Sequence, residues 1–221
     1  MGDAAERRIS WIMLAAGLLV MGAMFALSSN GMVRGLDSGH PVEYLQGTCI
    51  AGAIVLIIIF ALRLLNVAAL PMWFVAMLYG DIFYYVLSLC QGLYLDVSWW
   101  GYVSHMVASS IVGCIVFVAM CAIHEWSPPH VTLGTGGGIV AMTFLTGLAF
   151  GGIWEIIEGY IDIILGASYM SYSAIDTLCD LAADAVGMAC AAAAVWFALR
   201  KGGAKHVLAG VRIGKNAMNK G

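Results

Sequence analysis

The chain has 221 residues, of which 62% are hydrophobic and only 10% are charged, and its formal net charge is −3. Its mean hydropathy is +0.92. This balance excludes an ordinary soluble globular protein and is typical of a chain that crosses a membrane several times.

Six apolar stretches are long enough to cross a hydrocarbon core of ~30 Å, which takes about 20 helical residues. In chain order they are residues 9–28, 47–65, 67–90, 101–123, 136–165 and 175–199. They show no period-2 alternation, so helices are predicted rather than the strands of a barrel. The sequence therefore predicts an all-α polytopic membrane protein with about six transmembrane helices.

The distribution of positive charge predicts the orientation. Nine of the ten Lys and Arg residues fall on one side of the membrane if both termini are cytoplasmic, and Arg34 falls on the other. The positive-inside rule therefore places both termini in the cytoplasm. A cleaved signal peptide is the alternative for the first helix, although its apolar run of roughly 18 residues exceeds a signal core of about 7–15. Residues 1–199 are then one transmembrane domain, and residues 200–221 are a basic cytoplasmic tail.

Carboxylates form two stripes in the last two predicted helices. They are Glu155, Glu158 and Asp162 in the fifth helix and Asp176, Asp180 and Asp184 in the sixth. At about 100° per residue, the first stripe spans an arc of about 60° and the second an arc of about 80°. Each helix therefore carries its acids on one face.

Small residues continue both acidic stripes. They are Gly147, Gly151 and Gly159 in the fifth helix and Gly187 and Ala191 in the sixth. Because small residues let helix backbones approach closely in lipid, we expect these two helices to pack through these faces as an antiparallel hairpin. This packing would bring the six acids together in the outer half of the bilayer.

Asp81 in the third helix and His105 in the fourth are expected at a similar depth, on a rise of about 1.5 Å per residue. A carboxylate at a helix centre costs ~2.5–3.5 kcal/mol on insertion scales, and His105 is the only embedded basic candidate. The acids therefore need protons, a hydrated cavity or bound cations. For Asp162 and Asp176, which lie near helix ends, simple hydration is an equal alternative.

Of these three explanations for the buried acids, bound metal ions would also give the site a catalytic role. Oxygen ligands suit Mg²⁺, Ca²⁺ or Mn²⁺, and a contribution from His105 shifts the preference toward Mn²⁺, Fe²⁺ or Zn²⁺. We expect a divalent ion, with Mg²⁺ or Mn²⁺ favoured, held by the six acids of the two stripes. His105 and Asp81 are the candidate catalytic residues. The stripes are similar in spacing to the paired acidic motifs of membrane prenyltransferases related to ubiquinone biosynthesis, which bind a prenyl diphosphate through Mg²⁺.

A second resemblance covers most of the chain. The motif of Trp154, Glu155, Glu158 and Asp162, followed by that of Asp176, Thr177, Asp180, Leu181, Asp184 and Gly187, resembles the YjdF-like family of small polytopic bacterial inner-membrane proteins. VanZ-like proteins are more distantly similar in the last two helices, and Asp184 stands where their motif carries Asn. The resemblance implies a multi-pass protein of the bacterial plasma membrane and implies no mechanism.

Three functions remain open at this point. The first is a divalent-metal-dependent enzyme acting on a phosphate-bearing membrane lipid or isoprenoid, although no Lys or Arg clamp for a leaving group is visible. The second is a cation transporter or channel, although no acid track crosses the inner half of the membrane. The third is a non-enzymatic binder of a cationic partner at the outer face. No nucleic-acid partner is expected, and a homo-oligomer is left open.

Overall fold

The computed structural model describes residues 3–37, 41–65, 68–69, 71–128, 133, 135–166, 173–208 and 211–213. Within these residues, six helices are long and apolar enough to cross a membrane. The prediction of an all-α protein with six such helices is therefore confirmed. The chain divides into two compact units, one of residues 1–98 and 210–221 and one of residues 99–209.

The N-terminal unit contains the first three long helices. Its elements are α1 (Asp3–Ser29), α2 (Arg34–Asp37), α3 (Val42–Leu64), β1 (Ala68–Ala69), α4 (Met72–Cys90), α5 (Leu93–Asp96) and β2 (Arg212–Ile213). The two short strands pair antiparallel, with Ala68 opposite Ile213. Helix α4 begins later than the predicted residue 67 because Pro71, which has no N–H to donate, caps its first turn after the strand.

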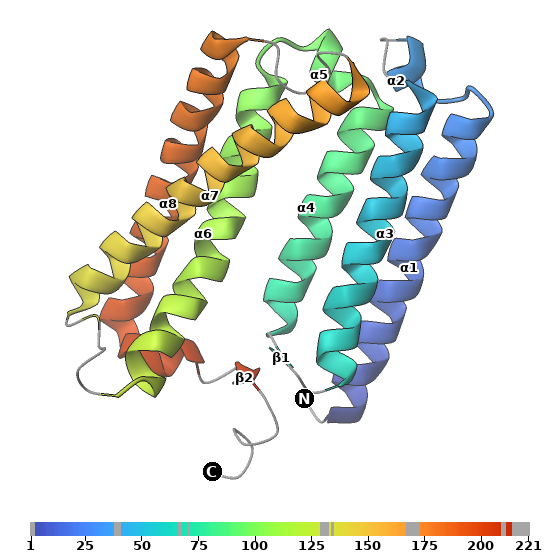
Figure 1. Cartoon of the computed structure of the whole chain (residues 1–221). Helices are drawn as coiled ribbons and strands as arrows, with labels where there is room; N and C mark the ends of the chain where they lie inside the picture. Colours follow the sequence, from blue (N-terminus) through green and yellow to red (C-terminus); the bar gives the residue numbers. More distant parts are fainter. Residues whose placement is uncertain are drawn as a thin grey trace. The chain divides into compact units, whose positions relative to one another are not determined.

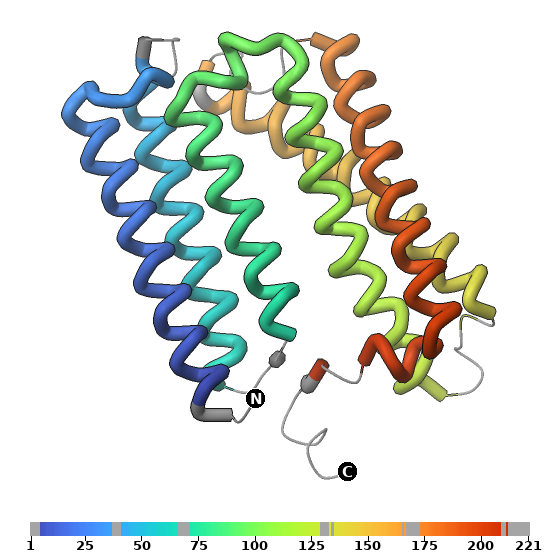
Figure 2. The backbone as a smooth tube through the Cα atoms, turned by 180° about the vertical axis from the view of Figure 1, so that it is seen from behind, coloured from blue at the N-terminus to red at the C-terminus, as the bar shows by residue number. Residues whose placement is uncertain are grey.

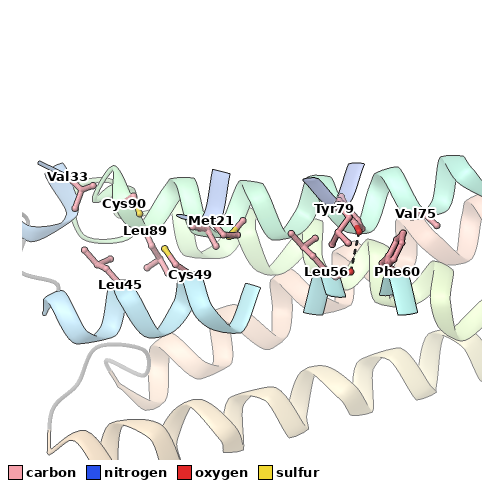
Figure 3. Close-up of a cluster of buried hydrophobic side chains, with 12 residues drawn as sticks. Met21, Val33, Leu45, Cys49, Leu56, Phe60, Val75, Tyr79, Leu89 and Cys90 are labelled. Atoms are coloured by element: carbon pink, nitrogen blue, oxygen red, sulfur yellow. Dashed lines mark hydrogen bonds between the residues drawn. The ribbon is translucent and has the colours of Figure 1, made fainter. Parts of the chain in front are cut away.

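The core of this unit lies among α1, α3 and α4 and is apolar (Figure 3). Met21, Leu56 and Tyr79 belong to this core, and the Tyr79 hydroxyl donates a hydrogen bond of 3.2 Å to the Leu56 carbonyl oxygen. One end of the unit is closed by an ion pair of 2.7 Å between Glu6 and Arg63. This ion pair joins the first turns of α1 to the last turn of α3, away from the apolar core.

The C-terminal unit consists of α6 (Trp100–Trp126), α7 (Gly136–Leu165) and α8 (Ala174–Leu208). Helices α6 and α8 run side by side, and α7 crosses them obliquely in the opposite direction (Figures 1 and 2). Helix α8 continues beyond residue 199, where the tail was predicted to begin, and Gly203 adopts a positive φ of 68° near its end. That conformation favours glycine and redirects the last turn.

The predicted close approach between the fifth and sixth helices is correct for the small residues of the fifth helix, α7, and wrong for those of the sixth, α8. Gly147 and Gly151 of α7 do face α8, where they contact Met188 and Asp184. The small residues of α8, however, pack on α6. The Ser110 hydroxyl donates a hydrogen bond of 3.1 Å to the Gly187 carbonyl oxygen in this second contact.

The physical reason is that small residues on α6 match those on α8. Ser109 and Gly113 are spaced four apart on α6, as Gly187 and Ala191 are on α8, and the two pairs face each other. This small-residue spacing on both partners permits the closest backbone approach in lipid. The intervening segment of the predicted hairpin, residues 167–172, lies outside the described residues.

The outward faces of the helices are apolar. Leu19 is 74% exposed, Ile163 76% and Ile164 79%. A soluble protein rarely exposes large apolar surfaces of this kind, whereas lipid solvates them without cost. The chain is therefore a multi-pass membrane protein.

Candidate metal site

The acidic stripes of α7 and α8 are buried inside the C-terminal unit. Five of the six carboxylates have exposed fractions between 3% and 7%: Glu155, Glu158, Asp162, Asp180 and Asp184. The sixth, Asp176, lies half-buried in the first turn of α8, where its backbone N–H bonds to the Ser173 hydroxyl oxygen at 3.1 Å. Residue spacing predicted that the acids of each helix share one face. The structure adds that these faces are buried, because α8 packs against both α6 and α7.

His105 of α6 stands in the middle of these acids. Its Nδ1 atom lies 3.3 Å from Asp184 Oδ1 and 3.8 Å from Glu155 Oε1. Its Nε2 atom, on the other edge of the ring, lies 3.9 Å from Asp180 Oδ1. The imidazole therefore contacts carboxylates from both α7 and α8.

Three of these residues lie close enough together that they could hold a metal ion. His105, Glu155 and Asp184 each offer one ligand atom, and these atoms all lie within 4.8 Å of one another. Two ligand atoms bound to one hard divalent ion at about 2.0–2.6 Å are at most about 5 Å apart. A single ion can therefore contact all three side chains with little movement.

Several buried oxygens in the cluster accept no hydrogen bond from the described residues. They are both carboxylate oxygens of Glu155, Oε2 of Glu158, Oδ1 of Asp180 and Oδ2 of Asp184. A buried acceptor without a partner costs about 1–3 kcal/mol, and more when it is charged. This donor set of hard oxygens and one imidazole fits a divalent cation, which would satisfy the oxygens that the protein leaves unpaired.

Side-chain hydrogen bonds orient two of the carboxylates, and one of them, of 3.3 Å, joins His105 Nδ1 and Asp184 Oδ1. The Ser109 hydroxyl donates to Asp184 Oδ1, which leaves Oδ2 of that carboxylate free. The indole Nε1 of Trp154 donates to Glu158 Oε1 at 2.6 Å, so the two residues are joined along one turn of α7. In both carboxylates the second oxygen accepts no hydrogen bond from the described residues.

Residue spacing did not predict a role for Ser109, and it gave Trp154 only a place in a family motif. A signal for Ser109 was present, because it stands four residues after His105 and therefore on the same helix face. Its importance depends on α6 lying against α8, which periodicity does not reveal. For Trp154, the spacing of four residues to Glu158 was the available signal.

Asp81, the second predicted catalytic residue, lies half-buried in α4 of the N-terminal unit. Four acids of the stripes are not members of the three-residue group: Glu158, Asp162, Asp176 and Asp180. The catalytic roles of His105 and Asp81 and the ligand roles of all six acids remain predictions.

The sequence supplies few cations to balance the buried acids. No Lys or Arg stands between Arg63 and Arg200, a stretch that includes α4, α6, α7 and most of α8. Near the end of α8, Lys205 forms an ion pair of 4.0 Å with Glu125, which lies near the end of α6. His105 is therefore the one basic side chain that contacts the acidic cluster among the described residues.

Comparisons with known proteins assign this chain to a family and give no individual relative. No curated protein matches it. No solved structure matches it. A family model described as "Predicted membrane protein (DUF2238)" matches residues 13–201, a match consistent with the resemblance to YjdF-like membrane proteins. Because the match covers most of the chain, with residues from all six apolar helices and the whole acidic cluster, the chain belongs to the DUF2238 family of predicted membrane proteins.

Proposed function

We propose that the protein is a divalent-metal-dependent membrane enzyme that acts on a phosphate-bearing lipid or isoprenoid. The observation that carries the proposal is the placement of ligand atoms from His105, Glu155 and Asp184 within 4.8 Å of one another. Mg²⁺ and Mn²⁺ are the favoured ions, because two of the three ligands are carboxylates and the third is an imidazole. Ca²⁺, Zn²⁺ and Fe²⁺ are the alternatives to be compared.

A phosphate group is the substrate feature that suits this cluster. Five buried carboxylates would repel a phosphate, and no Lys or Arg contacts them among the described residues. A phosphate can therefore approach only through a bound cation. Three protein ligands leave coordination positions open, and Mg²⁺ sites commonly fill such positions with substrate phosphates and water.

At such a site, the metal ion and the side chains of the protein would have different chemical roles. When bound, a divalent metal polarises phosphoryl oxygens and neutralises charge that develops on them. Glu158 is held through one oxygen by Trp154 and keeps the other without a hydrogen bond, so it is our candidate for accepting a proton. Ser109 holds Asp184 in its ligand orientation. Burial in the membrane limits water at the cluster and strengthens these interactions.

The test uses the purified full-length chain reconstituted in vesicles with a panel of phosphate-bearing lipids and isoprenyl phosphates or diphosphates. We expect release of phosphate or diphosphate that requires Mg²⁺ or Mn²⁺, stops on chelation and is lost in Glu155→Gln. Glu43→Gln, which removes an exposed carboxylate in the first turn of α3, is the matched control and should keep full activity. Metal binding without turnover of any lipid in the panel would count against the enzymatic proposal.

A second candidate is a cation transporter in which the ion is the cargo. The specific observation in its favour is the imbalance between five buried acids and the single basic side chain that contacts them. Uptake of Mn²⁺ into proteoliposomes separates the two functions. Transport that is lost in Glu155→Gln and retained in Glu43→Gln would favour this candidate, and the absence of uptake beside lipid turnover would exclude it.

A further inference from the structure

We propose that Asp180 is a positioning residue rather than a metal ligand, and that it orients His105 so that Nδ1 faces the ion. This inference rests on the proposed metal site and assigns a distinct role to one of its acids. Asp180 was grouped with the other carboxylates by spacing, but the structure places it on a different edge of the imidazole. The consequence is a defined tautomer of His105.

The two ring nitrogens of His105 face different acids. Nδ1 lies near Asp184 and Glu155, at 3.3 and 3.8 Å from their nearest oxygens. Nε2 lies 3.9 Å from Asp180 Oδ1. The group of atoms that can surround one ion contains His105, Glu155 and Asp184 and leaves Asp180 out. Asp180 is thus nearest to the ring nitrogen that does not face Asp184 and Glu155.

A neutral imidazole has one N–H and one nitrogen lone pair, and only the lone pair binds a metal. Histidine ligands almost always donate the other N–H to a carboxylate, a carbonyl or water, which fixes the ring and raises its basicity. Asp180 Oδ1 faces Nε2 and is buried without a hydrogen bond. An approach of about 1 Å turns this contact into a hydrogen bond from Nε2.

The need for Asp180 follows from what surrounds Nδ1. Asp184 and Glu155 both attract a proton to that nitrogen, and a proton on Nδ1 blocks its lone pair. A carboxylate at Nε2 competes for the proton and moves it to the far side of the ring. Asp180 and Asp184 stand four residues apart on α8, so one helix face presents a carboxylate to each side of His105.

The experiment uses the full-length purified protein and Mn²⁺ as the probe. Electron paramagnetic resonance measures the Mn²⁺ dissociation constant, and electron spin echo modulation with ¹⁵N-histidine reports whether an imidazole nitrogen is bound. Wild-type protein should bind Mn²⁺ with coupling to one imidazole nitrogen, and His105→Gln should lose that coupling. Asp180→Asn should weaken binding about 10–100-fold and lose the coupling, while the remaining Mn²⁺ stays on carboxylates.

Two further variants keep the test decisive. Glu125→Gln removes a carboxylate at the end of α6, where it pairs with Lys205, and should retain both the nitrogen coupling and the affinity. Asp180→Glu keeps a carboxylate at the position and should restore the nitrogen coupling, which a merely structural defect would not allow. The inference is overturned if Asp180→Asn leaves the nitrogen coupling intact, whether or not affinity falls. Wild-type protein that binds Mn²⁺ without nitrogen coupling overturns this inference alone, whereas wild-type protein that binds no Mn²⁺ overturns the metal site as well.

Discussion

The carboxylate of Asp184 on α8 lies directly against Gly151 on α7, in the space that a β-carbon at Gly151 would occupy. The atom nearest to that space is Oδ2, the oxygen of Asp184 that accepts no hydrogen bond from the described residues. Gly151 therefore provides the room in which a proposed metal ligand takes its position. This contact joins the small-residue packing of the helices to the chemistry of the cluster.

Gly151→Ala is expected to weaken metal binding because the added methyl group displaces the Asp184 carboxylate. Gly152→Ala is the matched control, since a β-carbon at Gly152 meets nothing within 4 Å. Both changes favour the helix by about 1 kcal/mol through propensity alone, so the comparison isolates the steric effect. Mn²⁺ titration should give at least about a tenfold weaker affinity for Gly151→Ala only, as for other losses of ligand orientation. Equal affinities in the two variants would contradict the assigned position of Asp184.

Ser109→Ala removes the hydroxyl that donates to Asp184 Oδ1. We expect Mn²⁺ affinity to fall by about 10–100-fold, because the carboxylate loses the partner that orients it. Ser88→Ala is the control: that buried hydroxyl donates to the Tyr84 carbonyl oxygen of its own helix at 2.6 Å, in the N-terminal unit. A loss of affinity of the same size in both variants would show a general effect on folding rather than on the site.

Gly187→Ala tests the contact between α6 and α8. A β-carbon there would overlap the backbone carbonyl oxygen of Met106, which cannot move as a side chain can. We expect destabilisation of about 1–3 kcal/mol, measured as a lower midpoint of thermal unfolding in detergent. Gly159→Ala, where a β-carbon meets nothing within 4 Å, should unfold at or above the wild-type temperature. An unchanged midpoint for Gly187→Ala would argue against this packing.

Trp154→Phe removes the hydrogen bond of 2.6 Å to Glu158 and keeps an aromatic ring. Because the bond reaches a buried carboxylate, its loss should cost about 1–3 kcal/mol in the free energy of unfolding. The control is Trp126→Phe, a 53% exposed residue at the end of α6. If the two substitutions shift the unfolding midpoint equally, Trp154 contributes only apolar surface.

Residue spacing predicted the parts of the structure that one helix determines by itself. The six apolar helices and the common faces of Glu155 and Glu158, and of Asp180 and Asp184, follow from helical periodicity. His105 was also a candidate, because its depth matched that of the acids. These features depend on length, hydrophobicity and angle along a single helix, all of which are properties of the sequence.

The features that depend on which helices are neighbours were not predictable in this way. Gly187 marks a face of α8 that can approach a partner closely, but nothing in its spacing distinguishes α6 from α7. For the same reason the spacing of Ser109 from His105 gave the shared helix face but not the partner of Ser109, which is on another helix. The edge of His105 that faces Asp180 depends on side-chain rotamers set by packing, which a pattern of residues does not contain.

Elemental analysis of detergent-purified protein, before and after chelation, tests the central claim most directly. The double variant Glu155→Gln/Asp184→Asn removes two of the three proposed ligand groups, and Glu43→Gln controls for the loss of a carboxylate. We predict about one divalent ion per chain in the wild type and in Glu43→Gln after loading with Mg²⁺ or Mn²⁺, removed by chelation, and none in the double variant. Protein that holds no divalent ion after loading, or a double variant that holds as much as the wild type, would contradict a metal site at His105, Glu155 and Asp184.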